Sequence, residues 1–231
     1  VFLAQKGQLD AFKQAGFSHV EWLPLACAPE LYPAEALERI YDVAYVGSLN
    51  VEDGGRRKRL LTAVAERFPN HKIGQFWPED MANIYAQAKI VVNACHNQDV
   101  NMRVFEAMAA GAMLLTDPAI GLEDLFEDGK HLVIYRNDDD VFDLISKYLE
   151  DDEQRQKIAQ NGKQLVLSNH TYACRMETII GEVQQALADI NKQKQTITAK
   201  QQGYYENPRR EVMQFIPLRT QRLLDVGCGA G

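Results

Sequence analysis

Between residues 41 and 135, short apolar runs rich in β-branched residues alternate with segments of helical periodicity. The runs are about four to eight residues long and end at glycine or at polar residues, as buried strands do. The segments between them place apolar side chains three and four positions apart, as amphipathic helices do. The predicted strands are residues 41–48, 71–76, 89–95, 112–116 and 131–135, and the predicted helices are 56–68, a helix beginning at Pro78, 101–111 and 121–127.

This alternation predicts an α/β fold. Strands that alternate with helices at this spacing form parallel sheets. Each helix carries the chain back to the end of the sheet where the previous strand began, by a right-handed crossover. We therefore expect a Rossmann-like parallel sheet of about five strands with helices on both faces. In such sheets a ligand binds in the crevice at the carboxyl ends of the strands.

The regions that flank this alternation have different patterns. Residues 1–40 hold a predicted helix, Leu9–Ala15, and a short strand, Val20–Leu23. Residues 138–150 and 153–190 are predicted to be helical, with His170 and Thr171 capping the later helix. The expected parts of the chain are residues 1–40 as the tail of a preceding domain and an interdomain linker, 41–190 as the main domain, 191–222 as a polar linker, and 223–231 as the start of another domain.

Composition narrows the function classes. The 231 residues are 46% hydrophobic and 25% charged, which is typical of a folded globular chain. The net charge of −7 opposes a nucleic-acid-coating role, because such proteins need a basic face. No apolar run approaches the roughly 20 residues that span a bilayer. The four cysteines lack zinc-ligand spacing, so we expect no metal site and a cytoplasmic location.

The segment from Asn101 to Gly111 carries the most informative polar residues. Arg103 and Glu106 are three positions apart on one face of the predicted helix, at the carboxyl end of the third strand. A helix N-terminus binds anions, Arg103 adds positive charge beside it, and Glu106 can accept the two hydroxyls of a ribose. An ordinary surface Arg–Glu pair has the same spacing, so the pattern alone leaves both interpretations open.

This segment and its continuation strongly resemble the C-terminal domain of GT-B glycosyltransferases of the spore-maturation-protein-like group, group 1. The resemblance covers about residues 41–190. It is carried by Tyr45–Ser48, Ile84–Lys89, Asn101–Gly111, Met113–Asp117, Gly121–Lys130 and His170–Tyr172.

The resemblance implies a function for residues 41–190. Such a domain binds a nucleotide-diphosphate sugar, with no further cofactor, and the sugar moves to an acceptor hydroxyl on an unknown sugar, lipid or protein. Glu106 stands at the glutamate of the Glu-x-x-Ala-x-Gly pattern, which contacts the ribose. Many relatives carry a second glutamate eight positions earlier, where this chain has Gln98. The stereochemistry, the catalytic residue and the acceptor stay open.

Four more residues are donor-site candidates from their place after the first two strands. Gly47 and Ser48 resemble a loop that lets a phosphate approach backbone N–H groups, although a simple tight turn has the same sequence. Arg56 begins a run of four basic residues that either supplies a cation to the diphosphate or is a solvated helix start. Trp77 could stack on the base, but a partly buried Trp packed beside Pro78 is the favoured interpretation.

Two other patterns have simpler interpretations. Asp138, Asp139 and Asp140 contain the Asp-x-Asp spacing that can hold a divalent metal, but they open a helix, so capping by Asn137 or Asp138 is favoured. His96 and His170 have no partners at metal-ligand spacing.

Residues 224–231 resemble the first motif of class I S-adenosylmethionine-dependent methyltransferases, with Asp225, Gly227 and Gly229 as the cofactor-binding positions. About 30 residues cannot bury a core of their own, so S-adenosylmethionine would bind only to a longer protein. The alternatives to a donor-binding domain are therefore a methyltransferase fragment and a noncatalytic nucleotide-binding or interaction module.

Overall fold

Five parallel strands form the central sheet of the chain, for which we describe a computed structural model over residues 1–50 and 55–205, without the side chains of Pro78 and of residues 193–205. All four strand pairings are parallel. This confirms the predicted α/β fold with about five parallel strands. The strands are β3 (Tyr41–Val46), β4 (His71–Gly74), β5 (Ala88–Asn93), β6 (Met113–Thr116) and β7 (Val133–Ile134).

The spatial order of the strands is β4-β3-β5-β6-β7, so β3, the first of these five along the chain, is not at an edge of the sheet. Val43 in β3 pairs with His71 on one side and with Ile90 on the other. The chain leaves β3 toward β4 and then crosses back to β5. A crevice opens where the connections diverge in this way, so the topology places the expected ligand site between the carboxyl ends of β3 and β5.

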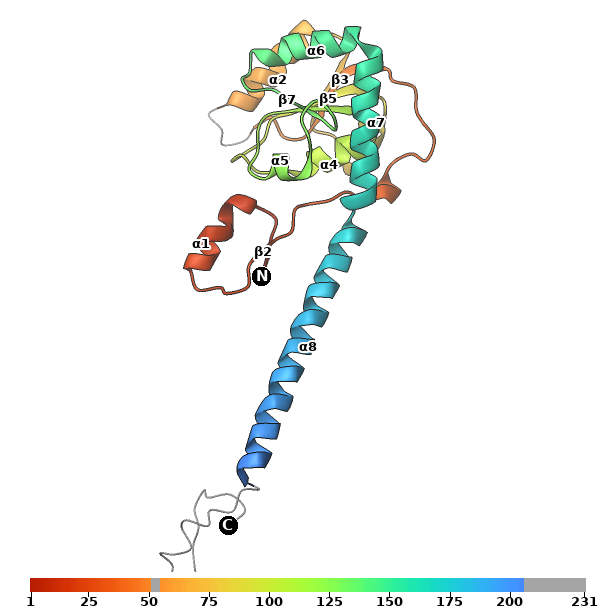
Figure 1. The fold of residues 1–231 in the computed structure, drawn as a ribbon. Helices are drawn as coiled ribbons and strands as arrows, with labels where there is room; N and C mark the ends of the chain where they lie inside the picture. The colour runs from red at the N-terminus through yellow and green to blue at the C-terminus, as the bar shows by residue number, and fades with distance from the viewer. Residues whose placement is uncertain (51–54, 206–231) are drawn as a thin grey trace, which may run out of the picture. The chain divides into compact units, whose positions relative to one another are not determined.

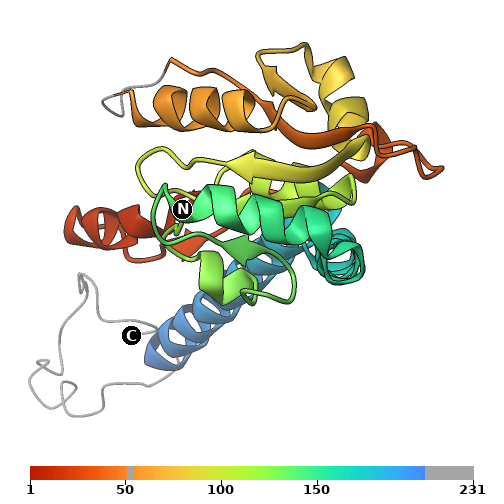
Figure 2. The same cartoon turned by 90° about the horizontal axis from the view of Figure 1, so that it is seen from above.

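Helices cover both faces of this sheet (Figures 1 and 2). Alternate residues of each strand point to opposite faces: Tyr45 packs with residues of α2 and α6, whereas Ala44 packs with residues of α3 and α4. Burial on both faces explains why the strands are continuous apolar runs. The helices are α2 (Arg56–Arg67), α3 (Pro78–Ala86), α4 (Met102–Ala109), α5 (Leu122–Leu125), α6 (Asp140–Glu150) and α7 (Asp152–Asn169).

The first 31 residues contain a separate two-stranded sheet. Strands β1 (Phe2–Leu3) and β2 (Glu21–Trp22) pair in parallel, with α1 (Leu9–Gln14) between them. These elements match the predicted helix and strand to within a few residues. Two 3₁₀ helices, Lys6–Gln8 and Pro29–Leu31, complete the segment.

The helical region predicted from residue 153 is divided at His170 and Thr171. The Thr171 hydroxyl accepts a hydrogen bond from the backbone N–H of Cys174 at 3.2 Å, which confirms Thr171 as a helix cap. The carbonyl of His170 accepts from the N–H of Cys27 at 3.0 Å, so it is used outside the helix. Helix α7 therefore ends at Asn169, and α8 (Tyr172–Tyr205) begins beyond the cap.

Helix α8 is drawn as one continuous helix in Figure 1. The stretch expected to be a linker from residue 191 is thus helical up to Tyr205. The chain divides into two units between Met176 and Glu177, and we describe each by itself. The methyltransferase-like positions Asp225, Gly227 and Gly229 lie outside the described residues. Within the described part of the chain, every helix is too short or too polar to cross a bilayer.

Candidate functional site

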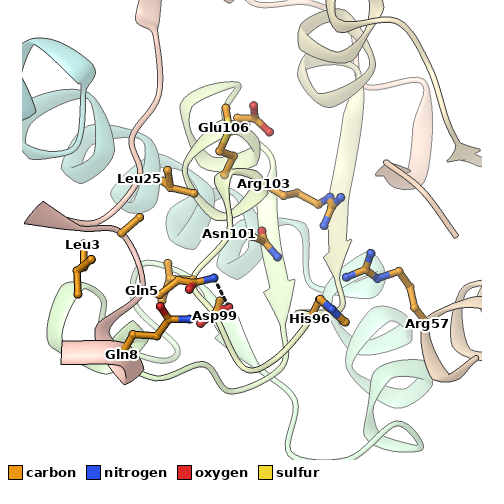
Figure 3. Close-up of a pocket in the computed structure, with 13 residues that line it drawn as sticks. Leu3, Gln5, Gln8, Leu25, Arg57, His96, Asp99, Asn101, Arg103 and Glu106 are labelled. Carbon is orange, nitrogen blue, oxygen red and sulfur yellow. Dashed lines mark hydrogen bonds between the residues drawn. The ribbon is translucent and has the colours of Figure 1, made fainter. Parts of the chain in front are cut away.

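A pocket of about 590 Å³ lies at the carboxyl end of the sheet, near the point where the strand order reverses. Figure 3 shows residues of the N-terminal segment on one side of it, Arg57 on the other, and His96 and Asn101 between them. Three predicted donor-site residues, Asn101, Arg103 and Glu106, line this pocket, whereas Gly47, Ser48, Arg56 and Trp77 are not among its lining residues. The lining residues are Leu3, Ala4, Gln5, Gln8, Leu25, Arg57, His96, Asp99, Val100, Asn101, Met102, Arg103 and Glu106.

Arg103 joins the two strands that border the crevice. Its guanidinium donates to the carbonyl of Val46 at the end of β3, from Nε at 3.0 Å and from Nη2 at 2.7 Å. Its Nη1 donates to Oδ1 of Asn93 at the end of β5, at 2.6 Å. Burial lowers the pKa of Arg103, but the nearby phenols of Tyr85 and Tyr45 outweigh burial and the pKa is raised. Arg103 therefore stays charged and holds β3 to β5.

Gly47 follows β3 and is tied to Arg103 by sterics. Its φ is +147°, a conformation that favours glycine, and a Cβ at this position would collide with Nη2 of Arg103. Its N–H donates to the carbonyl of Gly74 at 2.9 Å, so this N–H is already hydrogen-bonded to the end of β4. Ser48 bonds locally, because its hydroxyl donates to the carbonyl of Asn50 at 3.1 Å. Gly47 and Ser48 thus shape the turn beside Arg103.

Glu106 lies one turn beyond Arg103 on α4, in the wall of the pocket. The side chain is half-buried, yet its carboxylate forms no hydrogen bond or ion pair with another described residue. Burial raises the pKa of Glu106, and the positive charge of Arg103 offsets only part of this effect. The carboxylate thus lies in the pocket wall near the positive charge of Arg103, with its oxygens free to accept hydrogen bonds from a ligand.

Two more polar atoms in the pocket wall have no hydrogen-bond partner in the described part of the chain. Oδ1 of Asn101 and Nδ1 of His96 are buried and unpaired. Both residues flank a loop in which Asn97 and Gln98 have φ values of +55° and +56°, a left-handed conformation that is uncommon for residues other than glycine. Unpaired polar groups and backbone strain persist where the surrounding structure compensates for them, and they often mark binding sites.

The structure distinguishes two adjacent arginines at the start of α2. Arg56 is bound by two carboxylates, Asp117 at 2.7 Å and Asp138 at 2.6 Å. Burial lowers the pKa of Arg56, but its hydrogen bonds to Asp138 and Asp117 outweigh burial and raise it. Arg57 instead brings its guanidinium to the pocket wall, where Nε and Nη2 also donate to the carbonyl of Ala94. Of these two arginines, Arg57 therefore lines the pocket.

Trp77 is 76% exposed, so the expectation of a partly buried Trp packed beside Pro78 is wrong. The reason is local. Trp77 is the residue that precedes helix α3, in an extended conformation with φ −67° and ψ 150°, and its side chain projects from the turn.

The three consecutive aspartates have separate roles. Asn137 caps α6, because its side-chain oxygen accepts from the N–H groups of Asp139 and Asp140 at 3.1 Å each. Asp138 pairs with Arg56. The expected cap is therefore made by Asn137. Among residues 1–50 and 55–205 no group of three or more His, Cys, Asp or Glu side chains is arranged to hold a metal ion.

Several lining residues had no signal in the local sequence. Asp99 accepts a hydrogen bond at 2.8 Å from Nε2 of Gln5, which lies beside it in the N-terminal segment (Figure 3). Burial raises the pKa of Asp99, partly offset by His96 and by the bond from Gln5. This contact joins residues far apart in the chain, so spacing could not predict it. For Arg57, the basic run was a signal, but it did not tell which arginine faces the pocket.

Several solved structures have the same fold as this chain. Sucrose-phosphate synthase from Thermosynechococcus elongatus aligns with a TM-score of 0.59 and 16% identity, over 82% of this chain and 58% of that one. Anabaena Alr3699/HepE in complex with UDP-glucose aligns with a TM-score of 0.64 and 14% identity, over 80% of this chain and 63% of that one. At these identities the similarity shows the fold alone.

A third similar structure is a mutant of S. aureus TarM, solved in complex with Fondaparinux, alpha-GlcNAc-glycerol and UDP, with a TM-score of 0.61 and 14% identity. It aligns over 78% of this chain and 43% of that one. The chain thus spans less than two thirds of the length of these structures. A search of curated proteins found no match.

A family model supplies the sequence-level comparison. The model described as glycosyl transferase-like matches residues 39–181, which include the whole parallel sheet and the helix that carries Arg103 and Glu106. This match covers more than half of the chain, and the five-stranded fold agrees with it. The chain therefore belongs to the glycosyl transferase-like family.

Proposed function

We propose that the pocket binds a nucleotide-diphosphate sugar and that the chain is the donor-binding domain of a glycosyltransferase. The observation that carries this proposal is Glu106, a half-buried carboxylate in the pocket wall that forms no hydrogen bond or ion pair with another described residue. An ionised carboxylate only accepts hydrogen bonds, so it suits a ligand with adjacent hydroxyls, such as a ribose. Arg57, on the side of the pocket away from the N-terminal segment, supplies positive charge for the diphosphate (Figure 3).

The comparisons support the class of donor. Alr3699/HepE was solved in complex with UDP-glucose and, separately, with UDP and glucose. Its fold matches this chain, and its ligand has the ribose and diphosphate that Glu106 and Arg57 would bind. We assign Gly47, Ser48 and Arg103 to the shape of the crevice beside this ligand. The sugar would then pass to an acceptor hydroxyl, and the acceptor is the part of the reaction that these residues do not define.

Two finer assignments rest on sequence resemblance. The order of motifs from Tyr45 to Tyr172 supports a place in the spore-maturation-protein-like group. The motif with Asp225, Gly227 and Gly229 supports a fused S-adenosylmethionine-dependent methyltransferase. The chain's own pocket does not depend on the second assignment.

Calorimetric titration of the full chain tests the proposal. We expect binding of at least one of UDP, GDP, dTDP and CDP, and of the matching nucleotide sugar. Glu106→Gln removes the charge with little change in shape and should weaken both the nucleoside and the nucleoside diphosphate by about 10- to 100-fold, since a charge-assisted hydrogen bond contributes about 1.5–3 kcal/mol.

The matched control is Glu182→Gln, which removes a carboxylate from an exposed position of α8 and should change affinity little. Equal affinities for the two variants would remove Glu106 from the site. Absence of binding by all four nucleotides and their sugars would contradict the donor-binding function and favour a noncatalytic interaction module.

A further inference from the structure

Helix α8 carries a stripe of large apolar side chains on its exposed surface. The five residues have between 48% and 54% of their surface exposed, although they are among the most apolar residue types. We call this set the α8 stripe. It consists of Met176, Ile180, Val183, Leu187 and Ile190.

The spacing of the α8 stripe is that of a coiled coil. Successive members are separated by four, three, four and three residues, which is the alternation of a and d positions in a heptad. In these terms Ile180 and Leu187 occupy a positions, and Met176, Val183 and Ile190 occupy d positions. The roughly 14 steps from the first to the last member extend about 21 Å along the helix. A surface helix that only covers a globular core usually has a broader apolar face.

Residues beside the α8 stripe determine which partner it suits. Between residues 176 and 190 the helix has three acidic residues, Glu177, Glu182 and Asp189, and no Lys or Arg. Helices that lie on membranes carry basic residues on their polar face, so this charge pattern disfavours a lipid surface. Of the e and g positions within this segment, only Glu177 is charged, whereas Ile179, Gln184 and Ala186 are neutral. A second copy of the same helix would therefore meet little like-charge repulsion.

The exposed area also agrees with a pair of helices. At about 100 Å² of exposed surface for each half-exposed aliphatic side chain, ten side chains from two copies would remove roughly 1,000 Å² from water before their flanking residues are counted, which approaches the lower limit of specific interfaces. Just over two heptads are short for a coiled coil, so the pair should dissociate on dilution.

From this geometry we propose that two copies of the chain associate through the α8 stripe as a two-stranded coiled coil. The proposal is independent of the donor site, because no member of the stripe lines the pocket. Knobs at a and d on one helix enter holes on an identical helix, so one stripe serves as both halves of the interface.

Sedimentation velocity of the full chain, from about 1 to 200 µM, tests this association. The wild-type chain should change from monomer to dimer across this range. Ile180→Glu/Leu187→Glu should stay monomeric throughout, because it places charges in the seam. Ala188→Glu, which adds the same kind of charge at the outer b position, should dimerise as the wild type does. Leu187→Ala keeps helix propensity and should weaken the dimer at least ten-fold.

Each outcome decides the proposal. A wild-type chain that is monomeric at the highest concentration overturns it, and so does dimerisation that the seam variants leave unchanged or that Ala188→Glu abolishes equally. Helix content measured by circular dichroism at the lowest concentration, where all the chains should be monomeric, separates loss of pairing from loss of the helix. Nucleotide affinity should stay the same in all these variants, so this test and that of the donor site fail separately.

Discussion

The two ends of the central sheet both carry charged cavities, but they differ in how completely their polar groups are paired. At the amino ends of the strands, a cavity of about 310 Å³ is lined by four cationic residues. Arg39 donates to the carbonyls of Tyr85 and Ala88 at 3.0 and 2.8 Å, and to that of Gly111 at 2.6 Å. We call this the amino-end cavity; its cations are Arg39, Lys89, Arg155 and Lys163.

Most of these cations complete the fold. Lys89 pairs with Asp42 at 2.6 Å, and buried Arg155 donates to the carbonyl of Tyr148 at 2.7 Å and pairs with Asp152. Arg39 bonds at the carboxyl ends of α3 and α4, where helix carbonyls lack partners. The amino-end cavity is therefore positively charged for structural reasons.

The pocket at the carboxyl ends has the opposite character. Glu106, Asn101 and His96 each place a polar atom in its wall that no described residue binds. The contrast shows that charge alone does not identify a ligand site. The number of polar atoms left unpaired is the better criterion, because the fold gives no reason for them.

The largest expected effect is on stability at the amino end. Arg39→Met should lower the free energy of unfolding by about 3–5 kcal/mol, because it leaves several carbonyls at the ends of α3 and α4 without a donor. Urea unfolding followed by circular dichroism measures this change. Nucleotide affinity of the folded variant should be unchanged.

Lys163→Met is the matched control in the same cavity. Lys163 forms no hydrogen bond or ion pair with another described residue, so its replacement should alter stability by less than about 0.5 kcal/mol. If both variants had equal effects, the cavity would be sensitive to charge and not to pairing, and the comparison between the two ends would fail.

Replacing Arg103 should give a smaller loss of stability together with a loss of binding. Its guanidinium bonds both border strands of the crevice, and the residue also lines the pocket. Arg103→Ala removes the bridge from Val46 to Asn93 and should cost about 2–3 kcal/mol. It should weaken a nucleoside diphosphate more than the bare nucleoside if its charge also reaches the phosphates. Unfolding and calorimetry on the same preparation measure the two effects, and equal losses for both ligands would limit Arg103 to a structural role.

The smallest expected effect on stability is at Asn101. Asn101→Ala removes an unpaired buried oxygen as well as a 3.2 Å bond to Asn93, so the two contributions should cancel to within about 1 kcal/mol. Affinity for the nucleotide sugar should fall about 3- to 10-fold if the ligand uses Oδ1. A loss of stability as large as that of Arg39→Met would show that Asn101 is needed for the fold and would blur the distinction between the two ends.

The sequence was informative where chemistry and periodicity are local. The five strands follow from runs that are buried on both faces, and Glu106 stands out because it is the one acidic residue of its helix, α4. The choice between Arg56 and Arg57 was not local. Neighbouring positions on a helix differ by about 100° in direction, and Asp117 and Asp138, which pair with Arg56, lie far along the chain.

The Asp99–Gln5 hydrogen bond could not be predicted from local sequence either, because it joins the N-terminal segment to the loop after β5. The exposure of Trp77 depends on the direction of a single turn, and residue type alone favoured burial. The sequence patterns thus predicted the helices and strands and the carboxyl end of the sheet as the place of the pocket. They did not predict which side chains cross from one segment to another.

Gly47 also restricts the order in which this protein can evolve. A side chain at this position would collide with Nη2 of Arg103, and the φ of +147° adds strain of its own. A lineage in which Gly47 mutates first therefore bears both costs at once. One in which Arg103 shortens first loses the bridge between β3 and β5 but opens the space. Substitutions at the two positions are thus expected to depend on each other's history, with position 103 changing before position 47.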